Sequence, residues 1–306
     1  MTKKLLPILA LIATAVIWGI TVPLLKVNLE TLPPFSLAFI RFTIATVIVM
    51  GLSELSGLKL KDFLHIGVFA FFGVTLHIGL LLLGLRETTT IDASFVFSLG
   101  PVITSLLAVF AIREKINFSH ILGICIAFLG AFLYALYPLL FGSLEFRTNL
   151  LGDLLVLAST ISASIYIVGS KKLFETYKPS TISAVSFTVG AISFLPFSLW
   201  EFSDPTWLAN VSWFNIGSLI FFGIFSSFLA YSVYEWALSK VAVHIDATIS
   251  YLIPIISILL ATTLFKENLE PIFPVSFVLV ALGIYLVSRF HPPTMHGHYH
   301  RHHHKA

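Results

Sequence analysis

Three ionisable side chains stand inside long apolar stretches: Arg41, His77 and Glu235. A charge at the centre of a membrane-spanning helix costs about 2.5–3.5 kcal/mol on insertion scales. Arg41 can bind a carboxylate or pair with an acid that locks one conformation, or it can simply bond to helix-end carbonyls and reach toward the headgroups. An imidazole with an ordinary pKa of about 6.5 suits a proton relay, although a hydrogen-bonded neutral ring in a packing seam is the simpler interpretation of His77. Glu235 can load and release a proton, unless it only reaches the interface near Lys240. We treat these three residues as candidates for proton coupling or gating.

Two glutamates end a pair of similar segments and join that set of candidates. Residues 101–114 read PVITSLLAVFAIRE and residues 254–267 read PIISILLATTLFKE, and both 254−101 and 267−114 give 153. Glu114 and Glu267 each follow a basic residue, so that mirrored ion pairs could close the two sides of a carrier. Ordinary charges at the membrane interface are the alternative.

Hydroxyl-bearing and aromatic side chains recur at helical spacing along four apolar segments. Ser94 and Ser98 are four residues apart, as are Thr14 and Trp18, so each pair shares one helix face. Small polar residues also serve ordinary helix packing in lipid, but four such stripes favour a polar cavity. The predicted substrate cavity consists of Thr14, Trp18, Thr21, Ser94, Ser98, Ser159, Ser162, Tyr166, Tyr231, Ser250 and Tyr251.

The elements that position these residues must lie in a lipid bilayer. Of the 306 residues 57% are hydrophobic and 11% charged, and the mean hydropathy is +0.96, whereas soluble domains are about a quarter charged. Spanning the hydrocarbon core takes roughly 20 apolar residues, and ten such stretches are predicted. They are residues 5–25, 34–53, 63–84, 92–112, 119–140, 150–170, 180–200, 213–237, 245–265 and 271–289.

The distribution of basic residues predicts the orientation. Ten spans place both termini on one side, and most Lys and Arg residues of the connections fall on that side, Lys3, Lys59 and Lys171 among them. The positive-inside rule therefore predicts cytoplasmic termini. The single cysteine excludes a cysteine-rich metal site, the net charge of +3 is small, and no phosphate-binding loop motif occurs. We expect no metal, no cofactor and no nucleic-acid partner.

The similarity between segments extends along the chain. Residues 71–73 and 221–223 both read FFG, an offset of 150 (221−71). The fold class that this predicts is all-α integral membrane, with ten transmembrane helices as two inverted five-helix repeats at residues 3–141 and 149–290. Five is an odd number, so the two units enter the membrane from opposite sides and can open a shared cavity to each side in turn. Two halves already complete that cavity, so a monomer is expected.

The tail at residues 291–306 holds seven of the eleven histidines. We expect it to be disordered and cytoplasmic with no transport role, and weak metal binding is the alternative.

Several of these features resemble the EamA-type branch of the drug/metabolite transporter superfamily. They are residues 15–19 (AVIWG) in the first span, Arg41 early in the second, and the two proline-to-glutamate segments, each followed by a glycine-containing span. The resemblance covers residues 3–290. It implies an inner (plasma) membrane carrier of small metabolites, often an exporter of amino acids or related compounds, and a structural or gating role for Arg41.

The leading hypothesis is thus a secondary transporter that exports a small-molecule substrate, driven by the substrate gradient or by protons. Two alternatives remain open, an integral-membrane enzyme and a broad-specificity drug efflux carrier. An enzyme needs clustered Asp/His pairs or a nucleophile with its base, and no such cluster is visible. The small four-helix efflux relatives rely on a glutamate in the first helix, and none lies in residues 5–25.

Overall fold

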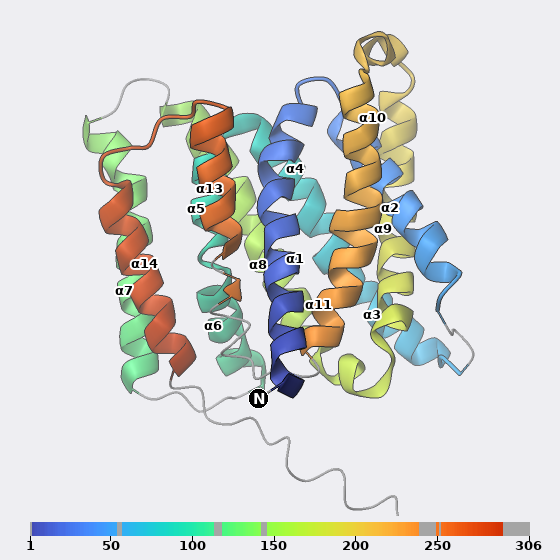
Figure 1. The fold of residues 1–306 in the computed structure, drawn as a ribbon, viewed down its shortest axis with the longest axis horizontal. Helices are drawn as coiled ribbons and strands as arrows, with labels where there is room; N and C mark the ends of the chain where they lie inside the picture. Colours follow the sequence, from blue (N-terminus) through green and yellow to red (C-terminus); the bar gives the residue numbers. More distant parts are fainter. Residues whose placement is uncertain are drawn as a thin grey trace, which may run out of the picture.

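The computed structural model of the chain describes residues 2–53, 57–112, 118–141, 146–238, 249–250 and 252–289. Within these ranges the regular structure is helical, and the long helices stand side by side (Figure 1). The first part of the chain forms α1 (Thr2–Asn28), α2 (Pro34–Met50), α3 (Leu60–Ala70), η1 (Phe71–Leu76), α4 (His77–Glu87), α5 (Thr90–Phe97), α6 (Gly100–Ile112) and α7 (Phe118–Phe141).

The second part of the chain begins with the longest helix. Its elements are α8 (Phe146–Thr176), α9 (Pro179–Glu201), η2 (Pro205–Asn210), α10 (Trp213–Ile220), η3 (Phe221–Leu229), α11 (Ala230–Leu238), α13 (Leu252–Leu264) and α14 (Phe273–Arg289).

Among the described residues, six helices are long and apolar enough to cross a membrane. They are Leu5–Asn28, Leu60–Glu87, Thr90–Ala108, Leu150–Ser170, Pro179–Glu201 and Trp213–Tyr234, and four shorter apolar helices accompany them: Pro34–Met50, Ile121–Tyr134, Leu252–Leu264 and Phe273–Val287. The prediction of an all-helical, multi-pass membrane chain is therefore confirmed.

Local sequence explains where several helices begin. Both α2 and α9 start directly at a proline, Pro34 and Pro179, after an extended residue. Proline suits the first helical position because its missing N–H would have no partner inside the helix and its φ is already helical.

One of these six spans, Thr90–Ala108, is divided by a turn at residues 98–99, which corrects the expectation of a single continuous helix over residues 92–112. The helix stops after Phe97 and resumes at Gly100. Pro101 has no N–H to donate to the carbonyl of Phe97. In the turn before it, the Leu99 N–H bonds the carbonyl of Val96, three residues back, at 3.1 Å.

Two other predicted spans are continuous but change their winding midway. Residues 71–76 and 221–229 are π-helical, and both segments begin at an FFG sequence. Short π-helical turns are rare and are frequent at functional sites.

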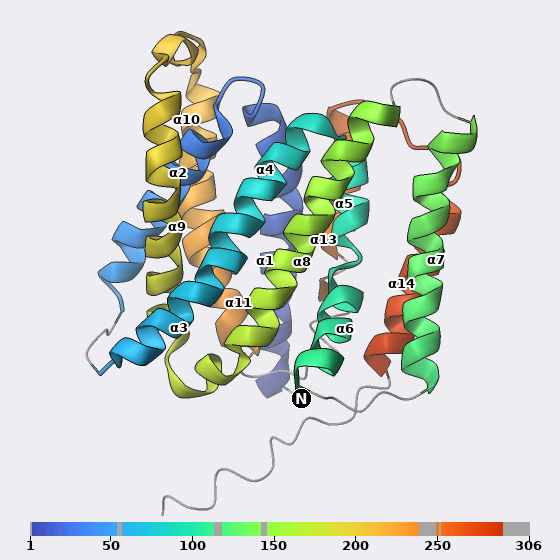
Figure 2. The same cartoon turned by 180° about the vertical axis from the view of Figure 1, so that it is seen from behind.

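Pairs of helices from the two parts of the chain pack against each other. The pair of α7 with α14 stands at one edge, and α2 packs on α9 at the other (Figure 1). From behind, α4 and α8 run side by side across the molecule (Figure 2). The central helix α1 contacts α13 and α11, so residues on α1 face elements from the second part of the chain.

Candidate functional site

The site centres on the contact between α1 and the π-helical segment η3. The indole Nε1 of Trp18 donates to the backbone oxygen of Ser226 at 3.0 Å, and Thr21 Oγ1 donates to the Ser226 hydroxyl at 2.9 Å. Trp18 and Thr21 were predicted site residues, and Ser226 was missed. Its signal was present in the sequence as two adjacent serines, Ser226 and Ser227, inside the apolar run FFGIFSSFL.

Arg41 completes this contact from α2. Only 3% of its surface is exposed, its Nε donates to Ser227 Oγ at 2.6 Å and one terminal nitrogen donates to Ser226 Oγ at 3.1 Å. The guanidinium also lies over the rings of Phe42 and Phe222, at 5.4 and 6.0 Å from their centroids.

The described residues give Arg41 no carboxylate partner. Two neutral hydroxyls and two aromatic faces are its described contacts. Within the described part of the chain the charge of Arg41 is therefore balanced by dipoles and aromatic rings alone, and burying a charge in this way is costly. The sequence offered two structural alternatives for Arg41, bonds to helix-end carbonyls and a side chain that reaches the headgroups. The described contacts match neither of them.

Aromatic rings surround Trp18 on the side toward α11. The centroids of Tyr231 and Tyr234 lie 5.3 and 5.1 Å from the Trp18 ring, in edge-on and tilted arrangements. Phe187 of α9 contacts Tyr231 edge-on at 5.5 Å. These rings provide an apolar wall, with hydroxyl groups on the tyrosines, next to the Ser226 contact.

A small pocket opens on the other side of Trp18. Its lining includes Thr14, Trp18, Tyr234 and Ser250, and its volume is about 10 Å³, which is close to the minimum for one water molecule. Three residues of the predicted cavity therefore share one pocket, but the helices are closed around it. The pocket as it stands is too small for any molecule larger than water.

A mirrored contact joins α8 to the first π-helical segment, η1. Ser162 Oγ donates to the Phe72 carbonyl at 2.8 Å, just as Trp18 donates to a carbonyl of η3. The Tyr166 ring lies directly on Gly73, where an added Cβ would come within 2.2 Å of the ring. Only glycine permits this approach, and the Tyr166 hydroxyl reaches Ser186 Oγ at 3.4 Å.

His77 follows η1 and faces α8. Its Nδ1 lies 2.7 Å from Ser159 Oγ and 3.1 Å from the Ser159 carbonyl, and its ring meets Phe97 edge-on at 6.2 Å. When Nδ1 carries the proton it donates to that carbonyl. His77 is thus held in a hydrogen-bonded seam between α4 and α8, and Ser159, a predicted cavity residue, supplies both partner atoms.

The predicted serine stripe on residues 92–112 divides between two environments. Ser94 Oγ meets Ser257 Oγ of α13 at 2.6 Å and also bonds the Thr90 carbonyl. Ser98 Oγ donates to the Phe95 carbonyl in its own turn at 2.6 Å. Ser94 thus forms a polar contact with the second part of the chain, and sequence reasoning missed its partner Ser257.

Glu267 lies at the end of the bundle opposite the N-terminus and caps α5. Its two carboxylate oxygens accept the N–H groups of Thr90 and Ile91 at 3.1 and 3.0 Å. A carboxylate is favourable at a helix N-terminus, where unpaired N–H groups and the helix dipole attract negative charge. This capping role, rather than an ion pair with Lys266, is what the described contacts give Glu267.

Two aspartates and Thr88 connect four helices at the same end. Thr88 Oγ1 donates to Asp153 Oδ1 at 2.5 Å and lies 3.5 Å from Asp92 Oδ2, while the Tyr134 hydroxyl donates to Asp92 Oδ1 at 2.5 Å. The N-cap residue of α5 is Thr89, whose hydroxyl accepts the Asp92 N–H at 3.0 Å.

Three predicted residues lie outside what is described. Glu114 and Tyr251 fall on undescribed residues, and Glu235 belongs to α11 but its side chain is not described. The tail at 291–306 is also outside the described residues. Within the described part of the chain, no three His, Cys, Asp or Glu side chains are grouped to hold a metal ion.

A family profile described as "EamA-like transporter family" matches residues 5–136 and again residues 150–289. The chain belongs to the EamA-like transporter family. This confirms the resemblance seen in the sequence, and the EamA chain is a multi-pass membrane transporter.

The relatives of this EamA chain are named as transporters. Two from Archaeoglobus fulgidus, each called "Uncharacterized transporter", are 31% identical over 286 residues (92% of this chain, 98% of the relative) and 28% identical over 292 residues (92% and 96%). The "Uncharacterized transporter YetK" of Bacillus subtilis is 26% identical over 295 residues, covering 93% of this chain and 87% of YetK.

A solved structure shares the fold. Titled "Crystal structure of protein", it is 18% identical, with a TM-score of 0.64 over 93% of this chain and 97% of the other.

Proposed function

We propose that this EamA protein is a secondary carrier that exports small organic metabolites, amino acids or related compounds, across the inner membrane by alternating access. The observation that carries the proposal is the Ser226 contact, where Trp18, Thr21 and Arg41 of the first half meet the π-helical segment of the second half. The proposed carrier is a monomer with ten spans and both termini in the cytoplasm.

The contacts between the halves support an inverted repeat, on which alternating access depends. Lys26, near the end of α1, donates to the Thr88 carbonyl at 2.8 Å, and the Thr88 hydroxyl donates to Asp153, near the start of α8. The end of α1 and the start of α8 therefore share one end of the bundle, so these two helices run in opposite directions. They are the first helices of the two units proposed at residues 3–141 and 149–290, which the family profile also matches separately.

The mirrored hydrogen bonds support the same arrangement. Trp18 of α1 donates to a carbonyl of η3, and Ser162 of α8 donates to a carbonyl of η1. The first helix of each proposed unit thus holds the π-helical segment of the other. The α1–η3 contact and the α8–η1 contact could then open alternately, one for each side of the membrane.

The chemistry near Trp18 supports a substrate with an apolar part and an acidic group. The rings of Trp18, Tyr231 and Tyr234 suit stacking against an apolar or aromatic group. Arg41 has no described carboxylate partner, so a substrate carboxylate would supply its counter-charge once the helices separate. An amino acid satisfies both requirements.

Proton coupling is the second part of the proposal and rests on His77 or Glu235. The imidazole of His77 links α4 to α8 through Ser159. A charge gained on this ring would alter a contact between the two halves.

The test is counterflow of labelled amino acids by the purified protein in proteoliposomes, with and without an imposed proton gradient. We expect saturable, stereoselective exchange that the gradient accelerates and that His77→Gln or Glu235→Gln makes insensitive to the gradient. Arg86→Gln, which removes an exposed charge away from these contacts, is the matched control. Product formation in the vesicles would instead indicate an enzyme. If none of the amino acids showed counterflow, the proposed substrate class would be contradicted.

A further inference from the structure

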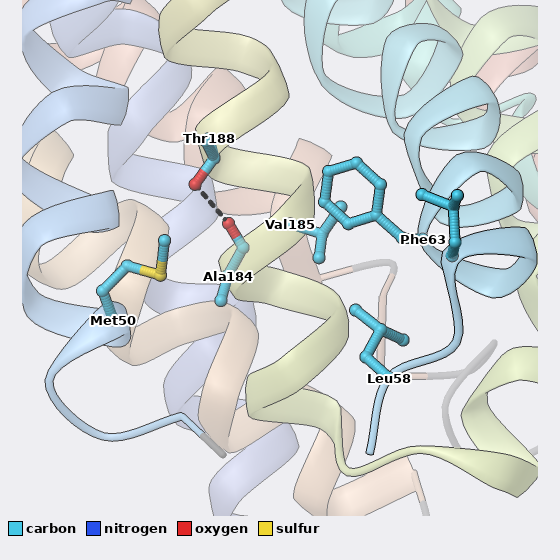
Figure 3. Close-up of a pocket in the computed structure, with 7 residues that line it drawn as sticks. Met50, Leu58, Phe63, Ala184, Val185 and Thr188 are labelled. Atoms are coloured by element: carbon cyan, nitrogen blue, oxygen red, sulfur yellow. Dashed lines mark hydrogen bonds between the residues drawn. The ribbon is translucent and has the colours of Figure 1, made fainter. Parts of the chain in front are cut away.

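A lateral hollow opens between the end of α2, the start of α3 and the middle of α9 (Figure 3). Its volume is about 330 Å³, and its walls include Met50, Leu58, Phe63, Val185 and Thr188. The Thr188 hydroxyl donates to the Ala184 carbonyl at 2.7 Å, so this polar side chain of the wall is already paired. The hollow lies at the edge of the molecule, and the contacts around Ser226 involve none of these residues.

The position of the hollow along α9 places it among the acyl chains of one leaflet. Ala184 and Thr188 come 6 (184−178) and 10 (188−178) residues after the cap of α9 at Lys178, which is about 9 and 15 Å at 1.5 Å per residue. Half of the hydrocarbon core is about 15 Å thick. The hollow thus extends from near the headgroups toward the middle of the membrane, on the side that holds the N-terminus (Figure 1).

Two exposed basic residues are sequence neighbours of residues that line this hollow. Lys59 and Lys61 alternate in sequence with Leu58 and Leu60, which line it, and both lysines are exposed. The neighbouring Asp62 carboxylate accepts the Tyr177 hydroxyl at 2.5 Å. This hydrogen bond raises the pKa of Tyr177, which lies between the membrane-spanning helices α8 and α9.

We propose that this α2–α3–α9 hollow binds an anionic phospholipid, with an acyl chain against Phe63, Val185 and Thr188 and the phosphate at Lys59 and Lys61. Basic pockets between membrane helices at the positively charged face of a protein favour anionic headgroups. An acyl chain is the apolar partner that a membrane supplies at this depth. The bound lipid would tie α3 to α9, two helices from different halves of the carrier.

The test measures lipid retention by the full-length protein after purification from vesicles of phosphatidylcholine that contain phosphatidylglycerol with the same acyl chains. Native mass spectrometry of the protein in mild detergent counts each lipid that remains bound. We expect phosphatidylglycerol to be retained preferentially, and Lys59→Ala/Lys61→Ala to weaken its binding roughly 30-fold, since each basic side chain attracts anionic lipid independently. Arg86→Ala, which removes an exposed charge at the other end of the bundle, is the control and should retain the lipid.

A second variant tests the acyl chain. Thr188→Phe fills the hollow with an apolar ring and should displace the lipid while the lysines remain, and a thermal unfolding curve identifies any variant that fails to fold. Equal retention of the two lipids would overturn headgroup recognition. Loss with the lysine variant but not with Thr188→Phe would overturn occupancy of the hollow, and full competition by inorganic phosphate would assign the site to free anions instead. None of these outcomes depends on the transported substrate.

Discussion

The two π-helical segments begin with the same three residues and yet have different partners. In η1 the carbonyl of Phe72 accepts both the His77 N–H and the Ser162 hydroxyl, and the His77 ring bonds Ser159. In η3 the carbonyl of Ser226 accepts from Trp18, and the two serines bind the buried Arg41. Related sequences therefore built one seam from neutral groups and the other around a charge.

The difference shows where the two proposed halves diverged in chemistry. The offset of 150 that aligns the FFG sequences also aligns His77 with Ser227 (227−77). One position of the proposed repeat thus carries an imidazole in the first half and a hydroxyl partner of Arg41 in the second. The charged seam is the candidate for anion recognition, and the neutral seam is the candidate for proton response.

The largest effect is expected from Arg41→Met. This variant removes the cation that would pair with the substrate carboxylate, and a hydrogen bond to a charged group is worth about 1.5–3 kcal/mol, so counterflow of a carboxylate substrate should fall more than about tenfold. Stability should change little, because replacing a buried charge by an apolar side chain of similar volume also removes its desolvation cost. Counterflow and thermal unfolding, measured on the same preparation, separate the two effects. A variant that is less stable to heat but shows unchanged counterflow would give Arg41 a purely structural role.

Gly73→Ala should be the next largest change and should act on stability. The added Cβ would lie 2.2 Å from the Tyr166 ring, and relief of such overpacking typically costs about 1–3 kcal/mol. Denaturant unfolding in detergent micelles measures the loss. Gly217→Ala in α10 is the matched control, since its Cβ would meet nothing within 4 Å, and equal stability of the two variants would contradict the tight packing of η1.

Trp18→Phe and Ser162→Ala remove the mirrored donors, and each should lower the free energy of unfolding by about 1 kcal/mol. Similar losses are expected because both donors satisfy a carbonyl of a π-helical segment. Thr75→Val is the control within η1, since its hydroxyl is buried without a hydrogen-bond partner and its removal should not destabilise. A loss in only one of the two seams would break the proposed equivalence.

His77→Gln should have the smallest effect of these hydrogen-bond variants, about 0.5 kcal/mol, because the Gln amide can replace the one neutral hydrogen bond to Ser159. Unfolding of the variant at several pH values measures this effect. A destabilisation as large as that of Gly73→Ala would mean that the imidazole is a principal support of the seam between α4 and α8.

Much of the fold was predictable because hydropathy reports membrane helices directly. The proline starts of α2 and α9 and most helix bounds follow from local sequence. The break after Phe97 was missed, although Pro101 was visible, because a proline bends or breaks a helix according to what satisfies the freed carbonyl. The prediction of one continuous helix over residues 92–112 was therefore wrong.

The site was predicted only in part. Trp18, Thr21 and Arg41 stood out because polar groups are rare in apolar spans, and the same reasoning applied to Ser226 and Ser227 would have found their partners. The capping role of Glu267 had no local signal, since Thr90 and Ile91 lie more than 170 residues away in the chain.

The sequence by itself determined that this chain is helical, lies in a membrane and belongs to the EamA family, because apolar length and recurring motifs are local properties. Only the tertiary structure decided which groups meet: Arg41 with two serines, His77 with Ser159, and Glu267 with the start of α5. The physical reason is that a buried polar group must find its partner in three dimensions. In a bundle of packed helices that partner comes from whichever helix lies beside it, not from its neighbours in the chain.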